Sequence, residues 1–283
     1  MKLDGRRTSS NVDDRRGKSS GKMSFGIGGT IVIGLIIWLL GGNPMDFISQ
    51  QMMDGGLAIE NYTPTEENDA MASFAKKILA GTEDVWTEIF EKNRMTYKPP
   101  RMVLFSRATS SGCGSASSST GPFYCSADQT VYIDLSFFEQ MKMQLNADGD
   151  FAYAYVIAHE VGHHVQYLLG TLDEVHKQQR SMSEKESNQL NVRMELQADF
   201  YAGIWAHYDD KNFGSLEDGD LEEGLNAASQ IGDDRLQMKS KGYTVPDAFN
   251  HGTSSQRTRW LKKGYQTGDV SAGNTFNLPY GQL

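Results

Sequence analysis

The chain is organised around the segment Ala158-His159-Glu160-Val161-Gly162-His163-His164-Val165-Gln166. It contains the pattern His-Glu-x-x-His, in which His159 and His163 are four residues apart. On a helix this spacing places both imidazoles on one face, one turn apart, where they can bind one Zn²⁺. Glu160 stands beside the first histidine and can reach a water at the open position of the metal. The pattern is typical of a zinc-dependent peptidase.

The residues around this pattern predict a buried helix over residues 151–169. A helix that is apolar nearly all round lies inside a protein, and this one carries Tyr155, Ile157, Ala158, Val161, Val165, Leu168 and Leu169. Two histidines and a glutamate are costly to bury without partners. A metal ion is the partner that uses all three. The alternative is a structural helix whose histidines are solvated.

A catalytic zinc site takes three protein ligands and leaves one position open, so the motif needs one more ligand. His164 follows a ligand histidine directly and therefore points about 100° away around the helix. His176 stands in a charged stretch without a supporting pattern. Glu195 is the better candidate, because Asp199 follows it at helical spacing in an apolar segment.

Glu195 and Asp199 lie on a second predicted helix, which begins at a capping box, Ser183–Glu186, and runs towards His207. The two carboxylates share one face of this helix. Glu195 can then be the third zinc ligand, while Asp199 accepts a hydrogen bond from the distal N–H of a ligand histidine and fixes its tautomer. The alternative is an ordinary solvated helix face. Flanking apolar residues favour the buried site: Leu196, Ala198, Phe200, Ala202, Ile204 and Trp205.

These motifs carry a family resemblance. His-Glu-x-x-His followed by Glu-x-x-x-Asp on a second helix is similar to the glutamate-type zincins. More closely, the chain resembles the putative neutral zinc metallopeptidase family of bacterial single-pass membrane proteins. The segments that match are Arg6–Gly17, the apolar span, Gly121–Cys125, Ala158–Gln166, Glu195–Asp199, Ile231–Asp234 and His251–Arg257.

The resemblance implies a membrane-anchored zinc metallopeptidase with Zn²⁺ as its cofactor and a protein or peptide as its substrate. The fold class that we expect is α+β: a mainly helical, zincin-like domain over residues 63–283 with a small antiparallel sheet, preceded by one transmembrane helix. The expected strands are 102–105, 123–125 and 130–134, with 126–129 as a turn. We expect capping residues at Thr82 and Ser136 to open further helices.

The amino-terminal part of the chain predicts a membrane anchor. Residues 1–23 carry seven basic and three acidic residues and are expected to be a disordered cytoplasmic tail. Residues 24–45 contain no charge, close to the roughly 20 apolar residues that a membrane-spanning helix needs. The positive-inside rule then predicts a single-pass protein of the inner membrane, with an extracytoplasmic domain after a linker at 46–62. A cleaved signal peptide is the alternative.

The two cysteines, Cys113 and Cys125, form no Cys-x-x-Cys pattern, so a thiolate zinc site is not indicated. They can form a disulfide outside the cytoplasm or remain free thiols inside it. A disulfide would close a loop of about a dozen residues and contribute roughly 2–4 kcal/mol to stability.

A catalytic mechanism follows as a hypothesis. Glu160 would act as general base and pass the proton to the leaving amine. His251, on a loop before a helix capped by Thr253, is the candidate that would stabilise the oxyanion; Tyr201 and Tyr243 are weaker candidates. The strand at 131–134 would bind an extended peptide by strand addition, as the zincin resemblance suggests.

Charge and composition narrow the partners. The net charge is -9, and because residues 1–23 are net positive, the remainder of the chain is more acidic still. An acidic body argues against nucleic acid as a partner. Asp233 and Asp234 are expected to cap a helix or pair with Arg235 rather than bind a second metal. Two alternatives to a peptidase remain: a membrane-tethered binding or chaperone-like protein, and a zinc hydrolase of a non-peptide amide. The oligomeric state is open.

Overall fold

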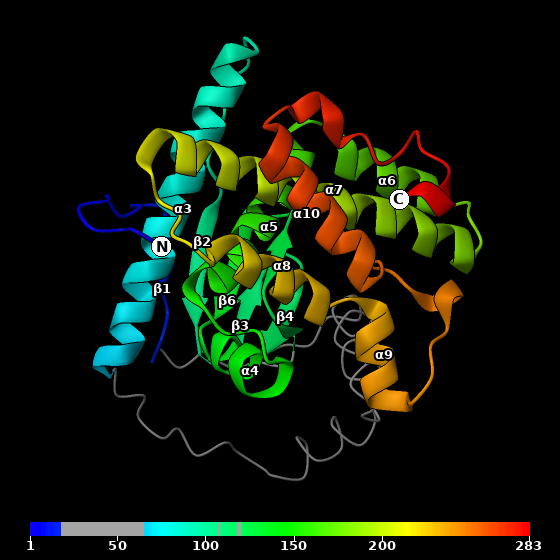
Figure 1. Cartoon of the computed structure of the whole chain (residues 1–283), viewed down its shortest axis with the longest axis horizontal. Coiled ribbons are helices and arrows are strands. Elements are labelled where there is room, and N and C mark those ends of the chain that lie inside the picture. The colour runs from blue at the N-terminus through cyan, green and yellow to red at the C-terminus, as the bar shows by residue number, and fades with distance from the viewer. Residues whose placement is uncertain (18–64, 107, 118–119) are drawn as a thin grey trace.

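A computed structural model describes residues 1–17, 65–106, 108–117 and 120–283 (Figure 1). Its α-helices are α3 (Glu66–Lys92), α4 (Ser136–Leu145), α5 (Asp150–Leu168), α6 (Thr171–Gln179), α7 (Glu184–Phe213), α8 (Asp220–Gln230), α9 (Asp233–Lys241) and α10 (Ser254–Thr267). Its strands are β1 (Val12–Asp14), β2 (Arg101–Phe105), β3 (Ala108–Ser111), β4 (Gly114–Ser117), β5 (Phe123–Cys125) and β6 (Thr130–Asp134). Short 3₁₀ turns follow at Pro246–Ala248 (η2), Val270–Gly273 (η3) and Tyr280–Gln282 (η4).

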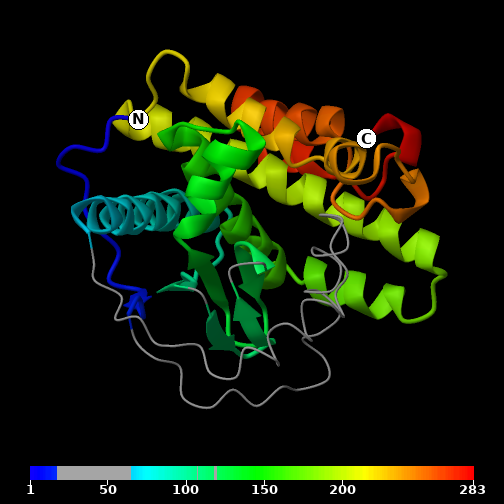
Figure 2. The same cartoon turned by 90° about the horizontal axis from the view of Figure 1, so that it is seen from below.

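The centre of the fold is the pair α5 and α7, with α10 packed on the other side of α7 (Figure 2). Two glycines allow these helices to approach closely. A Cβ on Gly162 of α5 would lie 2.9 Å from the Ala198 carbonyl oxygen of α7, and one on Gly264 of α10 would lie 2.1 Å from the Phe200 carbonyl oxygen. The metal motif on α5 is therefore held directly against the segment of α7 that carries Glu195 and Asp199.

The sheet lies on one side of these helices and has the strand order β1-β2-β6-β5 (Figure 2). β1 pairs with β2, and β2 with β6, in parallel; β5 alone runs antiparallel, against β6. The hairpin β3-β4 forms a separate two-stranded sheet. The expectation of a small antiparallel sheet is thus wrong for the main sheet. Residues 106–129 connect β2 to β6 and are long enough for the crossover that parallel pairing requires.

The first 17 residues are part of the folded domain, so the predicted disordered tail is wrong over that stretch. β1 extends the sheet, with Val12 opposite Met102. The Arg6 guanidinium lies 2.9 Å from the carboxylate of Asp209 on α7. The arginines of this stretch that suggested a solvated tail are each paired with a carboxylate instead: Arg6, Arg7, Arg15 and Arg16.

Glu83 of α3 is the main anchor of this amino-terminal segment. Its buried carboxylate accepts hydrogen bonds from the Arg7 guanidinium at 2.8 Å, the Ser9 hydroxyl at 2.5 Å and the Asn11 amide at 2.7 Å. Arg7 also pairs with Asp84 at 2.6 Å. A single buried carboxylate on α3 thus binds three residues of a segment more than 70 residues away in sequence.

The membrane anchor is the second correction to the expected fold class. The helix predicted over residues 24–45 and the linker predicted over 46–62 lie outside the described residues. Of the helices that the structure does describe, none has the length and apolar character needed to span a membrane. The structure supports a mainly helical domain with a small sheet. It does not support the predicted transmembrane helix.

Helix starts follow the expected capping residues only in part. The capping boxes at Ser183–Glu186 and Thr253–Gln256 are formed. Thr82 caps nothing: α3 is continuous through it, and its hydroxyl donates to the Leu79 carbonyl inside the helix. The box expected at Ser136 is also absent, because the Asp134 carboxylate accepts the Ser136 N–H instead.

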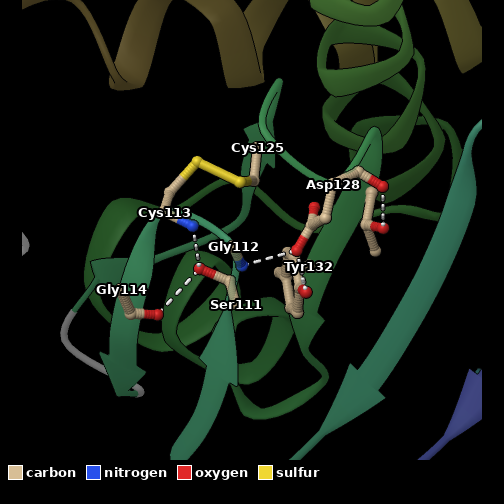
Figure 3. Close-up of a disulfide and its surroundings, with 8 residues drawn as sticks. Ser111, Gly112, Cys113, Gly114, Cys125, Asp128 and Tyr132 are labelled. Atoms are coloured by element: carbon tan, nitrogen blue, oxygen red, sulfur yellow. Dashed lines mark hydrogen bonds between the residues drawn. A yellow bond between two sulfur atoms is a disulfide. The ribbon is translucent and has the colours of Figure 1, made fainter.

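The structure contains a Cys113–Cys125 disulfide, with an S–S distance of 2.06 Å (Figure 3). It ties the β3-β4 hairpin to the last residue of β5. Asp128 supports the same corner by accepting the Gly112 N–H at 2.6 Å and the Tyr132 hydroxyl at 2.7 Å (Figure 3). β5 is consequently held by its pairing with β6 and, at its last residue, by the disulfide to the hairpin.

Candidate metal centre and active-site cleft

Helices α5 and α7 bring His159, His163 and Glu195 together. The Nε2 of His159 lies 3.2 Å from Glu195 Oε2, and the Nε2 of His163 lies 3.5 Å from Glu195 Oε1. One ligand atom from each of the three residues falls within 4.8 Å of the other two. His159 and Glu195 are each 7% exposed, so the group is nearly enclosed by protein.

The donor set fits a zinc ion. Two imidazole nitrogens and one carboxylate oxygen are the ligands of a three-ligand catalytic site. The surrounding negative charge also favours a cation at this place. Burial alone lowers the pKa of His159, but the charges and hydrogen bonds of Asp199 and Glu195 outweigh burial and raise this pKa to about 10. The pKa of His163 is raised by Glu195 in the same way, against its burial. The negative groups therefore attract positive charge to the place where the three ligand atoms converge.

Asp199 fixes the orientation of His159. Its carboxylate accepts the Nδ1–H of His159 at 2.8 Å, which leaves Nε2 as the ring nitrogen that faces Glu195. It also accepts the Tyr155 hydroxyl at 2.6 Å and the Arg257 guanidinium at 2.9 and 3.0 Å. Burial raises the pKa of Asp199, but Arg257 and His159 outweigh it and lower the pKa to about 2.

His163 has its own orienting partner, Gln166, which lies three residues along the same helix. The Nδ1–H of His163 donates to Gln166 Oε1 at 2.9 Å, so its Nε2 also faces Glu195. The Gln166 amide is completely buried and in turn donates to the Met194 carbonyl at 2.7 Å and to Gln197 at 3.1 Å. Both histidines thus present the same nitrogen to the ligand position.

His159, His163 and Glu195 line a cleft of about 420 Å³. Glu160, His251 and the ends of several elements line it with them. Glu160 follows His159 on α5 and is 8% exposed, so its carboxylate is in the cleft beside the ligand group but shielded from bulk water. The lining is otherwise mainly apolar and aromatic: Phe123, Tyr124, Phe137, Leu145, Val156, Leu172, Met194, Ile231 and Leu236. Such a mixture, with a few convergent polar groups, is typical of a ligand-binding cleft.

Comparison with known proteins agrees with this geometry. A family model described as "Putative neutral zinc metallopeptidase" matches residues 1–276. The chain belongs to this family. The uncharacterized protein YpfJ of Escherichia coli K12 is 48% identical over 98% of this chain and 99% of its own length. The uncharacterized protein Rv2575 of Mycobacterium tuberculosis H37Rv is 38% identical over 84% of each chain. No solved structure gives a significant match.

In this zinc metallopeptidase family member, only one of the three residues expected to stabilise the oxyanion lies at the cleft. His251 lines the cleft. Burial lowers its pKa, but the Asp233 hydrogen bond and the nearby negative charges outweigh this and raise it. Tyr201 is buried against Trp86, and Tyr243 is exposed; neither belongs to the described residues that line the cleft.

The remaining histidines of the motif region take other roles. His164 is fully buried and points away from the ligand group, as expected from its position on the helix. Its Nε2–H donates to the Lys98 carbonyl at 2.6 Å, and its Nδ1 accepts the Tyr124 hydroxyl at 2.9 Å. Burial lowers its pKa to about 4, so it remains neutral. His176 is exposed on α6 at the rim of the cleft.

The strand expected to bind substrate is not available. β6 is paired with β2 on one side and β5 on the other, so strand addition at 131–134 is wrong. The edge next to the cleft belongs to β5, whose Phe123 and Tyr124 line it. The sequence predicted β5 as a strand but not as the edge strand, because strand order within a sheet depends on the crossover.

Three site residues were not expected as such: Tyr155, Gln166 and Arg257. Two of them had a visible signal. Tyr155 precedes His159 by one helical turn, and Gln166 follows His163 by three residues on the same helix. Sequence spacing provided no signal for Arg257, because Arg257 contacts Asp199 from α10, 58 residues further along the chain.

Proposed function

We propose that this protein is a zinc-dependent metallopeptidase that hydrolyses peptide bonds with Glu160 as general base. One observation carries the proposal: two histidines with fixed tautomers and one carboxylate converge at a point beside a second carboxylate, that of Glu160, in the same cleft. His159, His163 and Glu195 would hold the zinc ion. When bound, the ion would supply a Lewis acid that makes water nucleophilic near neutral pH.

The residues of the chain then have distinct tasks. Glu160 takes the proton of the attacking water and delivers it to the leaving amine. His251 donates a hydrogen bond to the oxygen on which negative charge develops. The free edge of β5 pairs with an extended peptide and places it along the cleft. A purely structural metal site has no use for the Glu160 carboxylate, and this favours an enzyme over a binding protein.

We also propose that the domain works in an oxidising compartment outside the cytoplasm. The Cys113–Cys125 disulfide supports this, because structural disulfides persist in such compartments and are rare in the cytosol.

The test is zinc content and peptide cleavage in the purified protein and in two variants. The variants are Glu160→Gln and Glu174→Gln. We expect one zinc per chain in the wild type and in both variants, because neither substitution removes a zinc ligand. Glu160→Gln should lose at least about 100-fold in kcat, the lower range for losing a general base. Glu174→Gln, an exposed glutamate on α6, is the matched control and should retain wild-type activity. Absence of stoichiometric zinc, or full activity of Glu160→Gln, would overturn the proposal.

A further inference from the structure

The loop at residues 249–253 brings His251 to the cleft by resting directly on the ligand helix α7. It packs closely against α7 at Gly252, whose φ of +96° favours glycine. A Cβ there would lie 3.2 Å from Leu196 Cδ2 and 3.3 Å from Val192 Cγ1. Leu196 is the neighbour of the ligand Glu195, so the position of this loop sets the position of His251 relative to the metal group.

A single carboxylate, that of Asp233, organises this loop. Asp233 is the first residue of α9 and is fully buried. Its Oδ2 accepts three consecutive backbone N–H groups, those of Asn250 at 2.8 Å, His251 at 2.6 Å and Gly252 at 2.9 Å. Its own N–H donates to the Gly252 carbonyl at 2.9 Å. A buried charge needs several such donors to be stable, and here all of them come from the loop that carries His251.

The second oxygen of Asp233 contacts the imidazole itself. Asp233 Oδ1 lies 3.3 Å from His251 Nδ1 and accepts its N–H. This leaves Nε2 as the ring nitrogen available to the cleft. The two oxygens thus have separate tasks, one fixing the loop backbone and the other fixing the ring.

We propose that Asp233 is a positioning residue of the active site, which fixes both the place and the tautomer of His251 beside the metal group. The proposal rests on the proposed peptidase function, in which His251 contacts the substrate oxygen. The helix capping expected of Asp233 is not formed, because α9 has no side-chain cap hydrogen bond. Arg235, the other partner expected from sequence, donates to the Ser229 hydroxyl instead.

The neighbouring Asp234 provides a matched control. Its carboxylate accepts the N–H and the hydroxyl of Ser254 at 2.7 and 2.9 Å, which fastens the start of α10. It has the same charge, lies on the same turn of α9 and bonds to the same stretch of chain as Asp233. It has no bond to His251 among the contacts that the structure describes.

The experiment compares Asp233→Asn with Asp234→Asn, using ¹⁵N NMR of the histidine side chains in the full-length protein. In Asp233→Asn the amide oxygen can keep the three loop N–H groups, while the amide NH₂ replaces the oxygen that faces His251 Nδ1 and donates to it. We therefore expect neutral His251 to carry its proton on Nδ1 in the wild type and in Asp234→Asn, and on Nε2 in Asp233→Asn. An Nε2–H form in the wild type overturns the proposal even if the variant does not fold, and so does an unchanged tautomer in Asp233→Asn.

Kinetics supply the second measurement. We expect Asp233→Asn to keep its zinc and its KM within about twofold and to lose kcat by at least tenfold, towards the roughly 100-fold cost of one lost transition-state donor. In the background of His251→Ala, Asp233→Asn should cost little more, because the two residues act as one unit. Additive losses would mean that Asp233 acts on something other than His251. If Glu160→Gln shows that the peptidase proposal is wrong, the NMR result still decides the role of Asp233.

Discussion

Asp199 orients the metal ligand His159, and Arg257 keeps the Asp199 carboxylate ionised inside the protein. The Arg257 guanidinium contacts both oxygens of this fully buried carboxylate. Without that positive charge, burial favours the protonated acid, which is a poorer acceptor for the His159 Nδ1–H. The orientation of a ligand histidine on α5 is therefore set by a cation on α10.

Replacing Arg257 tests this dependence. We expect Arg257→Met to weaken zinc binding by on the order of 10- to 100-fold, as is usual when a group that orients a metal ligand is lost. Zinc competition with a chromogenic chelator measures it. Arg259→Met is the control, since Arg259 lies on the same helix but bonds to the Leu283 carbonyl at 2.6 Å. Equal zinc affinities in the two variants would contradict the assignment.

Zinc binding should release protons. Metal-free His159 has a pKa raised to about 10 and is protonated at neutral pH, whereas a zinc ligand must be neutral. Zinc affinity is thus expected to rise with pH from about 6 to about 10. Calorimetry in buffers of different ionisation enthalpy measures the protons released, and a pH-independent affinity without release would contradict the prediction.

The same shift affects stability in the absence of metal. Because the folded-state pKa of His159 lies above its ordinary value of 6.5, its contribution to stability is complete below pH 6.5. That contribution is lost as the pH rises towards about 10. Thermal unfolding of the metal-free protein should therefore occur at a lower temperature at pH 9 than at pH 6.5, and added zinc should reduce this difference.

Among the elements, helices were predictable where local signals were strong. The period of apolar residues placed α5 within one residue of its actual bounds, and the capping boxes of α7 and α10 are formed as expected. Elements whose form depends on distant partners were not predictable. Parallel pairing of β2 with β6 requires a crossover, and β1 becomes a strand only because β2 offers it an edge. The same reasoning applies to the site. The ligands on α5 and α7 could be predicted from their spacing in the sequence, whereas the roles of Arg257 and Asp233 depend on tertiary contacts and could not.

Contact between α5 and α7 at Gly162 gives a prediction at this scale. In an ordinary helix Gly→Ala is stabilising by up to about 1 kcal/mol. Here the added Cβ would lie 2.9 Å from the Ala198 carbonyl oxygen, so we expect Gly162→Ala to lower the free energy of unfolding by about 1–3 kcal/mol and to weaken zinc binding. Gly281→Ala, with no atom within 4 Å of the new Cβ, is the control in chemical denaturation. A Gly162→Ala protein as stable as this control would show that the helices can move apart freely.

For the whole molecule, the amino-terminal segment is a structural part of the domain. Glu83→Ala leaves Arg7, Ser9 and Asn11 without their shared acceptor, and we expect a loss of about 2–4 kcal/mol in unfolding free energy, since a buried network is broken. Glu91→Ala, an exposed change on the same helix, should be nearly neutral. Similar denaturation midpoints for both would mean that the segment contributes little.

The pairing of β1 with β2 also determines which side of a membrane each part of this protein can occupy. Residues 12–14 and the strand at 101–105 are hydrogen-bonded neighbours in one sheet, so no lipid bilayer can separate them. The described segments 1–17 and 65–106 therefore belong to one folded body. An amino terminus in the cytoplasm with a catalytic cleft outside it is incompatible with this sheet in one molecule. Topology reporters fused to the two ends of the chain should therefore give the same answer, and opposite answers would mean that β1 does not pair with β2 in the cell.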